Sequence, residues 1–95
     1  MKPNEIERCL NRLGFRLSST DPLRYQHYDS KGNKTLLHVK MPNSVDDQIT
    51  EDDIRLVAVA INVPYVKFID FMNYPLARNI QNEYETILKS AGFIK

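Results

Sequence analysis

The sequence has one cysteine, no tryptophan and no long hydrophobic run, and these scarcities exclude several classes of protein. The single cysteine, Cys9, cannot form an internal disulfide or supply a multi-cysteine metal site, which fits a reducing compartment. No apolar stretch reaches the roughly 20 residues that a membrane-spanning helix needs, and the first ten residues lack the hydrophobic region of a signal peptide. We therefore expect a cytoplasmic protein without a membrane segment.

A strong excess of one charge is also missing. Lys and Arg number 13 and Asp and Glu number 12, so the formal net charge is +1 and the chain lacks the basic signature of a dedicated nucleic-acid binder. Residues 1–49 carry eight basic and six acidic side chains, whereas residues 50–95 carry five and six. Any anion-binding surface should therefore lie in the first half of what we expect to be a single domain, 1–95.

The first half shows the pattern of a helix followed by three strands. Ile6, Leu10 and Leu13 recur at helical spacing, and Gly14 is expected to end that helix with a positive φ. The stretch FRLSS, residues 15–19, alternates as a short strand with Phe15 and Leu17 on one side and Arg16 and Ser18 on the other. The stretch from Leu23 to Lys40 follows as a hairpin.

The second half shows helical patterns only. Thr50 and Asp53 have the spacing of a capping box, and the following apolar run IRLVAVAIN predicts a helix that is covered on more than one side and is the central buried element. Asn62 can end it, and Pro64 can begin another helix, with Val66, Phe68, Ile69 and Met72 available for burial. A last helix is expected from Pro75 to Gly92, with an apolar stripe of Leu76, Ile80, Tyr84, Ile87, Leu88 and Ala91. The order predicts an α+β fold: an N-terminal helix, a three-stranded antiparallel sheet, and two to three helices packed on one face.

The turn DSKGN decides which way the hairpin side chains point. It predicts a three-residue loop with Gly32 at positive φ and a bulge, which pairs Asp29 with Asn33. Continued without interruption, this register pairs His27 with Thr35, Tyr25 with Leu37 and Leu23 with Val39, and places His38 across from Arg24. The core side then carries Leu23, Tyr25, Leu37, Val39 and Met41. The other side, here called the outer face, carries Arg24, Gln26, Tyr28, Lys34, Leu36, His38 and Lys40.

The two histidines therefore point to opposite sides of the sheet. His27 is interpreted as a structural histidine, and the outer face is the candidate binding site. Cationic groups attract phosphates, a tyrosine ring can stack on a base, and a histidine can transfer protons near neutral pH. The candidate nucleic-acid-binding residues are Arg24, Tyr28, Lys34, His38 and Lys40.

Several alternatives stay open beside RNA or phosphate binding. The outer face of an antiparallel sheet can be polar simply because water covers it. A protein partner could bind through the C-terminal helices or an exposed strand edge, and a second copy of the chain could pair there as a homodimer. RNA cleavage would use His38, the one catalytic candidate. No residue pattern predicts a cofactor or a metal site.

The stretches EIERCLNRLGFRL and YDSKGNKTLLHVKMP, within the order helix, three strands, helix, resemble the HicA toxin family over residues 4–62. That resemblance implies a double-stranded-RNA-binding-like fold, mRNA interferase activity in bacterial toxin–antitoxin pairs, and an antitoxin partner. The family's catalytic histidine belongs to a Gly-Ser-His motif at the start of the second strand. Here DPLRY stands at that place, with Arg24 about where the histidine would fall, so no residue inherits the catalytic role, and residues 64–95 extend beyond the family layout.

A second stretch, LVAVAINVPYVKFIDF, resembles the two helices of a helix-turn-helix. Ala58 would lie where the helices cross, and Asn62 would replace the usual turn glycine. The second helix offers few side chains for DNA, namely Tyr65, Lys67 and Asn73. We therefore interpret this stretch as core packing.

Overall fold

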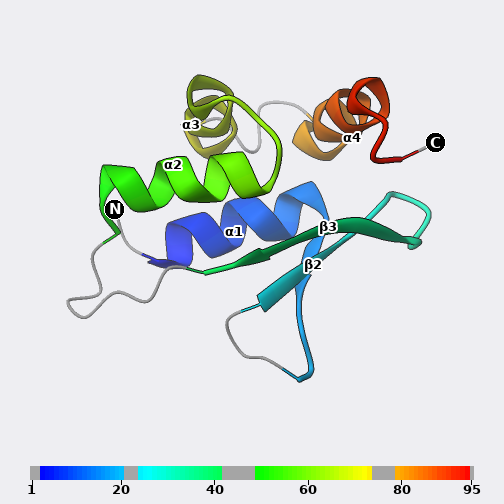
Figure 1. Cartoon of the computed structure of the whole chain (residues 1–95), viewed down its shortest axis with the longest axis horizontal. Helices are drawn as coiled ribbons and strands as arrows, with labels where there is room; N and C mark the ends of the chain where they lie inside the picture. Colours follow the sequence, from blue (N-terminus) through cyan, green and yellow to red (C-terminus); the bar gives the residue numbers. More distant parts are fainter. Residues whose placement is uncertain (1–2, 21–23, 42–48, 74–78, 95) are drawn as a thin grey trace.

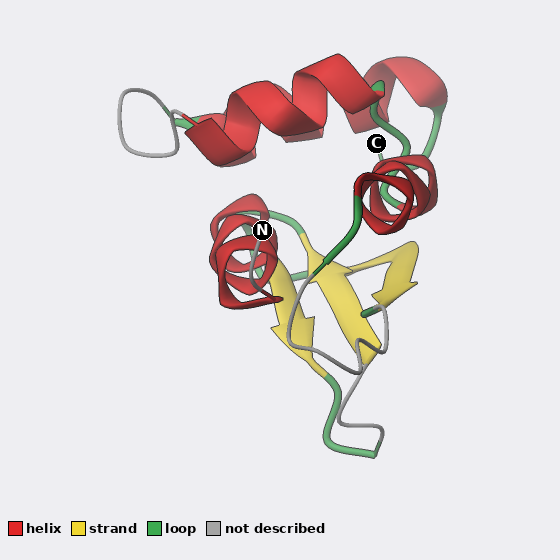
Figure 2. Ribbon diagram, turned by 90° about the vertical axis from the view of Figure 1, so that its left-hand side faces the viewer, coloured by secondary structure: helices red, strands yellow, loops and turns green. Residues whose placement is uncertain are grey.

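The computed structural model describes residues 3–20, 24–41, 49–73 and 79–94, and it has the predicted α+β architecture (Figure 1). Its elements are α1 (Pro3–Leu13), β1 (Phe15–Leu17), β2 (Arg24–Tyr28), β3 (Lys34–Lys40), α2 (Glu51–Ala60), α3 (Tyr65–Asn73) and α4 (Ile80–Ala91). The antiparallel sheet has the strand order β1-β2-β3. Figures 1 and 2 show α1 and α2 beside one face of the sheet, with α3 and α4 beyond them. No described helix is long and apolar enough to cross a membrane.

The helix at the centre of the packing is α1. Ile6, Leu10 and Leu13 are fully buried, as their helical spacing predicts, and the helix contacts β1, α3 and α4. Cys9 lies on the same buried side, and its burial raises the pKa of the thiol to about 12. The thiol therefore stays protonated at neutral pH and is a core group rather than a nucleophile.

The prediction that the apolar run of α2 forms the central buried element is wrong. Ile54, Val57 and Ala58 are buried against the rest of the domain, but the side chains of Leu56 and Val59 are 66% and 77% exposed. The helix packs against β3 and α3 along one stripe, and its opposite side faces solvent. An all-apolar run shows that a helix can be buried on any side, but it does not determine which other elements pack against each side.

The ends of α2 follow the predicted capping chemistry. The Thr50 hydroxyl accepts a hydrogen bond from the backbone N–H of Asp53, and the Asp53 carboxylate accepts one from the N–H of Thr50, which completes the capping box. At the other end Asn62 has a φ of 65°, and the backbone N–H of Val63 donates to the Ala58 carbonyl. This arrangement is a Schellman-type end, and it turns the chain toward α3.

The burial of α3 and α4 follows the predicted stripes only in part. Phe68 and Phe71 are fully buried, whereas Val66, which we expect inside, is 77% exposed. The last helix begins at Ile80, capped by the Asn79 side chain, and not at Pro75 as predicted, because the Asn79 cap sets its first turn; it ends at Gly92 as predicted. Ile80, Tyr84 and Leu88 are buried and Ile87 is partly buried, but Ala91 is exposed. Pro75 and Leu76 lie outside the described residues.

The hairpin has the predicted turn and the predicted sides, but its register changes partway. Gly32 has a φ of 85°, and the N–H of Asp29 donates to the Asn33 carbonyl, as the turn requires. Beyond Tyr28 and Lys34, a bulge in β3 shifts the pairing by two residues, so that Tyr25 lies opposite Val39 instead of Leu37. A shift of two residues preserves the sides of a strand. Tyr25, Leu37, Val39 and Met41 are accordingly buried, and Leu23 lies outside the described residues.

His27 is the polar centre of the core and is fully buried. Its Nε2 lies 2.9 Å from the Leu13 carbonyl oxygen, and its Nδ1 lies 3.0 Å from the Thr35 hydroxyl. A carbonyl can only accept, so a neutral ring donates from Nε2 and accepts at Nδ1. The ring also meets Tyr84 edge-on at 5.1 Å and Phe15 at 4.9 Å. This histidine therefore joins the end of α1, all three strands and α4, which confirms its structural role.

Gly14 makes this junction possible. Its φ is 107°, and an added Cβ would lie 2.4 Å from the Tyr28 carbonyl oxygen and 3.1 Å from His27 Nε2. The N–H of Tyr28 donates to the Gly14 carbonyl at 2.9 Å. A side chain at this position would therefore push β2 away from the end of α1.

We predict that stability falls with decreasing pH because of His27. Burial is the main cause of its lowered pKa, and Arg16 adds to the lowering, while the Leu13 carbonyl, Glu85 and Asp29 oppose it. As the pH falls below about 6.5, His27 becomes protonated in the unfolded chain, whereas in the folded protein it stays neutral to a lower pH. The free energy of unfolding therefore decreases as the pH falls through that range. Urea unfolding at a series of pH values measures this slope.

Two variants isolate the contribution of His27. His27→Gln should remove the slope at mildly acidic pH, whereas His38→Gln, which changes the exposed histidine on the other side of the sheet, should retain it. Asp29, whose pKa is lowered chiefly by the hydrogen bond from the Asn33 backbone, contributes only below about pH 4. An unchanged slope in His27→Gln would contradict the prediction.

We also predict that Gly14→Ala destabilises the protein much more than Gly32→Ala. Both positions have positive φ, so each alanine carries a strain of about 1–2 kcal/mol. Only at Gly14 does the new methyl group collide with backbone, because nothing lies within 4 Å of the equivalent point at Gly32. Thermal unfolding of both variants measures the difference, and equal losses would show that the close approach to β2 does not matter.

Candidate nucleic-acid interface

The outer face is built from cross-strand pairs of β1, β2 and β3. Because His27 points inward, its neighbours Gln26 and Tyr28 point outward. The structure pairs Arg16 with Gln26, Arg24 with Lys40, Gln26 with His38 and Tyr28 with Lys34. The prediction that His38 lies across from Arg24 is therefore wrong, because the β3 bulge moves His38 to a position opposite Gln26.

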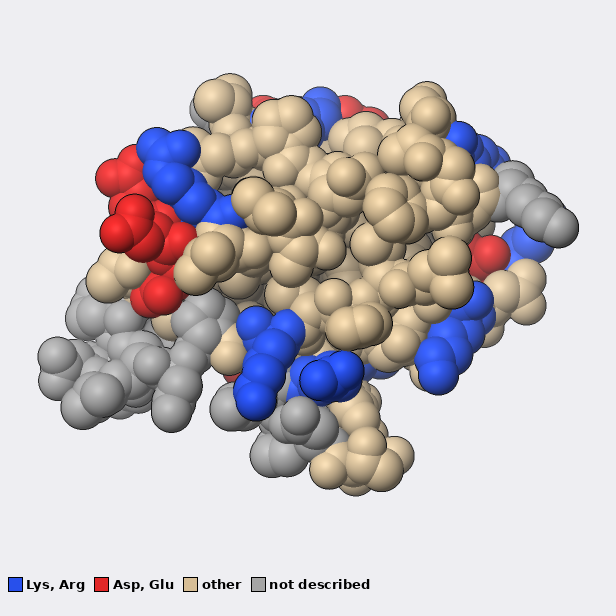
Figure 3. All heavy atoms as spheres, viewed as in Figure 1, with Lys and Arg blue, Asp and Glu red and all other residues tan. Residues whose placement is uncertain are grey.

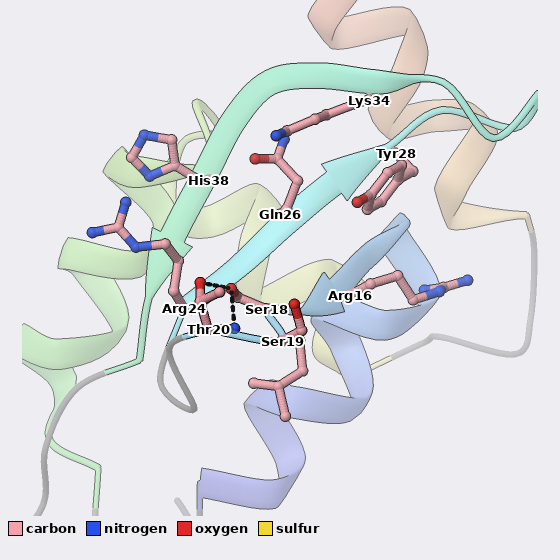
Figure 4. Close-up of a pocket in the computed structure, with 10 residues that line it drawn as sticks. Arg16, Ser18, Ser19, Thr20, Arg24, Gln26, Tyr28, Lys34 and His38 are labelled. Carbon is pink, nitrogen blue, oxygen red and sulfur yellow. Dashed lines mark hydrogen bonds between the residues drawn. The ribbon is translucent and has the colours of Figure 1, made fainter.

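A concavity of about 610 Å³ lies on this face (Figure 4). Figure 4 shows Arg24 and His38 at one end and Tyr28 and Arg16 at the other, with Gln26 between them. Its lining consists of Arg16, Leu17, Ser18, Ser19, Thr20, Arg24, Gln26, Tyr28, Lys34 and His38. Its volume lies within the range of about 300–1,000 Å³ found for small-ligand sites.

Four of the five candidate residues line this concavity, namely Arg24, Tyr28, Lys34 and His38. Lys40 is exposed on the same face but does not line it. The sequence did not identify Arg16 as a site residue, although the alternation of FRLSS places Arg16 on the side of the strand that faces away from Phe15. The missing information was the strand order, since only the pairing of β1 with β2 brings Arg16 beside Gln26.

Leu17 departs from the burial that its position suggests. It shares a side of β1 with Phe15, but Phe15 is fully buried whereas Leu17 is 54% exposed. The chain then turns at Ser18, whose hydroxyl lies 3.0 Å from the Thr20 hydroxyl and whose N–H donates to the Arg24 carbonyl. Ser18 and Thr20 therefore place short polar side chains at the rim of the concavity.

Gln26 holds the bulge of β3 in place. Its side-chain NH2 group shares its two donors among the carbonyl oxygens of Thr35 at 2.8 Å, Leu37 at 3.0 Å and His27 at 3.2 Å. Its amide oxygen receives no hydrogen bond from the part of the chain that the structure describes. The amide group is thus fixed by its nitrogen, and its oxygen remains available as an acceptor in the floor of the site.

The charge on the outer face has one sign. Arg16, Arg24, Lys34 and Lys40 all lie on it, and none of the outward residues of β1, β2 and β3 is acidic. Arg24 and Lys40 are direct cross-strand neighbours, and like charges in that position destabilise a sheet. No ion pair joins Lys34 or Lys40 to a carboxylate in the described ranges. An ordinary solvated surface mixes both signs of charge, whereas the described charged residues of this face are all positive.

Charged side chains are unevenly distributed over the face of the molecule that Figure 3 shows. In Figure 3, several Lys and Arg side chains lie along the lower edge, on the side of the sheet, and others lie at the top, at the upper left and at the right. Asp and Glu gather at the left, where α2 begins with Glu51, Asp52 and Asp53. The broad central surface in this view carries few charges.

The chemistry available at His38 is limited by its surroundings. The ring is exposed, and none of the described residues that line the concavity carries a carboxylate or is a second histidine. Acid–base cleavage of RNA by these residues would therefore have to combine His38 with arginine, lysine or Tyr28. Among the described residues, no three His, Cys, Asp or Glu side chains gather where they could hold a metal ion.

The α2–α3 pair does not present a basic recognition helix. Lys67 Nζ lies 3.3 Å from Glu83 and 3.7 Å from Asp70, and the Arg55 guanidinium lies 4.0 Å above the ring of Tyr65. Ala58 is buried where α2 and α3 pack together. These contacts agree with the interpretation of this stretch as core packing.

Comparison of the chain with protein-family models, with curated proteins and with solved structures finds no match in any of the three. The resemblance to the HicA family therefore stays a prediction that rests on the stretches quoted above.

We predict that Gln26→Leu loosens the β3 bulge. The leucine keeps the size of the side chain but leaves the carbonyls of Thr35 and Leu37 without their donor, which should cost about 1 kcal/mol. Native-state hydrogen exchange should show faster exchange of the β3 amide protons near the bulge. Leu36→Ala is the control, because Leu36 is 78% exposed in the same segment and its loss should leave exchange unchanged. Equal exchange in both variants would contradict the role given to Gln26.

Proposed function

We propose that the protein binds single-stranded RNA through the outer face of its sheet. The observation that carries this proposal is the single sign of charge on that face, where Arg16, Arg24, Lys34 and Lys40 accompany an aromatic ring and no described acidic residue. A group of cations on one face attracts a polyanion.

The other residues of the concavity suit bases rather than phosphate alone. Tyr28 is half-buried, so its ring is held by the sheet while part of it remains available for stacking. The amide oxygen of Gln26 and the imidazole of His38 can form hydrogen bonds to base edges. In a single strand the bases are free to reach such a surface, whereas in an RNA duplex they are stacked and paired inside.

The fold order supports kinship with HicA-like proteins, and we propose it on that basis. The catalytic histidine of that family has no counterpart here, and Arg24 stands near its place. We therefore expect binding without cleavage. If cleavage does occur, His38→Ala should abolish it in protein that stays folded, and normal cleavage by that variant would show that the assigned catalytic candidate is wrong.

We predict that RNA affinity falls steeply with salt and depends on Lys34 and Lys40. A plot of log affinity against log salt concentration has a negative slope. For single strands, each lost phosphate contact makes this slope less steep by about 0.7, so the Lys34→Gln/Lys40→Gln double variant should make it less steep by about 1.4. Fluorescence anisotropy with labelled single-stranded RNA at low and physiological salt measures both slopes.

The matched control is Arg55→Gln/Lys89→Gln, which removes two exposed positive charges from α2 and α4 on the helical side of the molecule. It should leave the slope nearly unchanged, and the same RNA samples should remain intact on a gel. If the control lowers the slope as much as the sheet variant, the attraction is non-specific. If no RNA binds even at low salt, the proposed function is wrong.

A second candidate function is favoured by the exposed apolar side chains of the helices. Leu56, Val59 and Val66 on α2 and α3 are 66%, 77% and 77% exposed. Such residues can mark a contact with another protein chain, either a partner or a second copy of this one. Apolar contact does not weaken as salt increases, so the salt series separates this function from RNA binding.

A further inference from the structure

A second basic concavity lies at the β1 end of the molecule, outside the site described above. It measures about 370 Å³ and is lined by Arg8, Asn11, Arg12 and Arg16. Arg8 and Arg12 come from the exposed side of α1, and Arg16 comes from β1. Since Arg16 also lines the concavity of the outer face, the two hollows meet at that residue.

We infer that Arg8, Arg12 and Arg16 form a second phosphate-binding site, which continues the RNA path from the outer face, around the β1 edge, onto α1. This inference rests on the proposed function for the identity of the ligand, but it adds Arg8 and Arg12, which lie outside the outer face. It makes the RNA footprint longer than the sheet alone would allow. The path runs from Lys34 across the sheet to Arg16 and ends at Arg8.

Arg16 is held in the position that such a path requires. Its Nη1 group donates to the carbonyl oxygens of Asn11 and Phe15, both at 2.9 Å. A guanidinium has five N–H donors, so Nε and Nη2 keep three that form no hydrogen bond within the described part of the chain. Figure 4 shows the side chain extending from β1 away from Arg24 and His38. A guanidinium fixed in this way can bind phosphate with less loss of side-chain entropy.

The position of Arg8 and Arg12 is unfavourable without a ligand. They are four residues apart on one helix, where two like charges destabilise the helix by about 0.2–0.5 kcal/mol. In the described ranges, no carboxylate forms an ion pair with either of them or with Arg16. The helix dipole stabilises Arg12, which lies in the last turn of α1, but Arg8 lies more than one turn from that end and is not stabilised in this way. A bound phosphate, with one negative charge, would reduce the repulsion among these three cations.

The experiment compares two lengths of single-stranded RNA. An oligouridine of about 4 nucleotides should occupy only the outer face, whereas one of about 12 nucleotides should also reach α1. The variant is Arg8→Gln/Arg12→Gln, which keeps good helix formers at exposed positions. We expect it to bind the short RNA normally and to lower the salt slope for the long RNA by about 1.4, the value for two lost phosphate contacts.

The sheet variant Lys34→Gln/Lys40→Gln separates this inference from the proposed function. It should weaken both lengths, while Arg55→Gln/Lys89→Gln should weaken neither. If Arg8→Gln/Arg12→Gln leaves the long RNA unaffected while the sheet variant weakens it, the second site is wrong and the proposed function stands. If only the arginine variant weakens binding, the sheet function is wrong and α1 alone binds phosphate. Equal binding of an acidic polypeptide such as polyglutamate would overturn RNA as the ligand of both sites.

Discussion

The rest of the structure depends on the hydrogen bond from His27 to the carbonyl of Leu13. A buried imidazole is costly unless both nitrogens have partners, and here the Thr35 hydroxyl provides the second. The ring therefore fixes the last residue of α1 to the middle of β2 and to the start of β3. Phe15 and Tyr84 pack around it, and the Tyr84 hydroxyl donates to the Ile61 carbonyl at 2.7 Å, which extends the junction to the end of α2.

The junction also determines the outer face. With His27 turned inward, strand alternation must turn Gln26 and Tyr28 outward, and the close approach at Gly14 brings β1 alongside β2. Gln26 then stabilises the bulge that places His38 beside it. On the far side of the junction, the buried carboxylate of Glu85 on α4 accepts a hydrogen bond from the N–H of Ser30 and secures the hairpin turn. The core interactions and the basic face are consequences of the same strand geometry.

Much of this fold could be predicted from local patterns in the sequence. The turn around Gly32 and the alternation of β2 and β3 predict the two sides of the hairpin, and the Thr50 capping box and Gly92 predict helix ends. The register beyond Tyr28 could not be predicted, because the bulge is held by contacts from Gln26 to the opposite strand. Features that depend on one element or one turn can be predicted from the sequence, whereas contacts between elements cannot.

The same distinction explains the predictions about α2 and the site. The composition of α2 permits burial on every side, but only the assembled helices show that Leu56 and Val59 remain uncovered. Likewise, Arg16 has the alternation of an outward residue, yet its place in both basic concavities follows from the position of β1 at the sheet edge. Nothing in the sequence places Arg8 and Arg12 next to a sheet residue.

The most direct test of the account is an NMR titration of ¹⁵N-labelled protein with a short single-stranded RNA at low salt. The account predicts that signals of the outer-face residues change, with the side-chain amide of Gln26 among them, while those of α2 and α3 remain unchanged. Changes confined to Leu56, Val59 and Val66, or no change at all, would contradict the claim that the single-sign charge on the sheet serves to bind RNA.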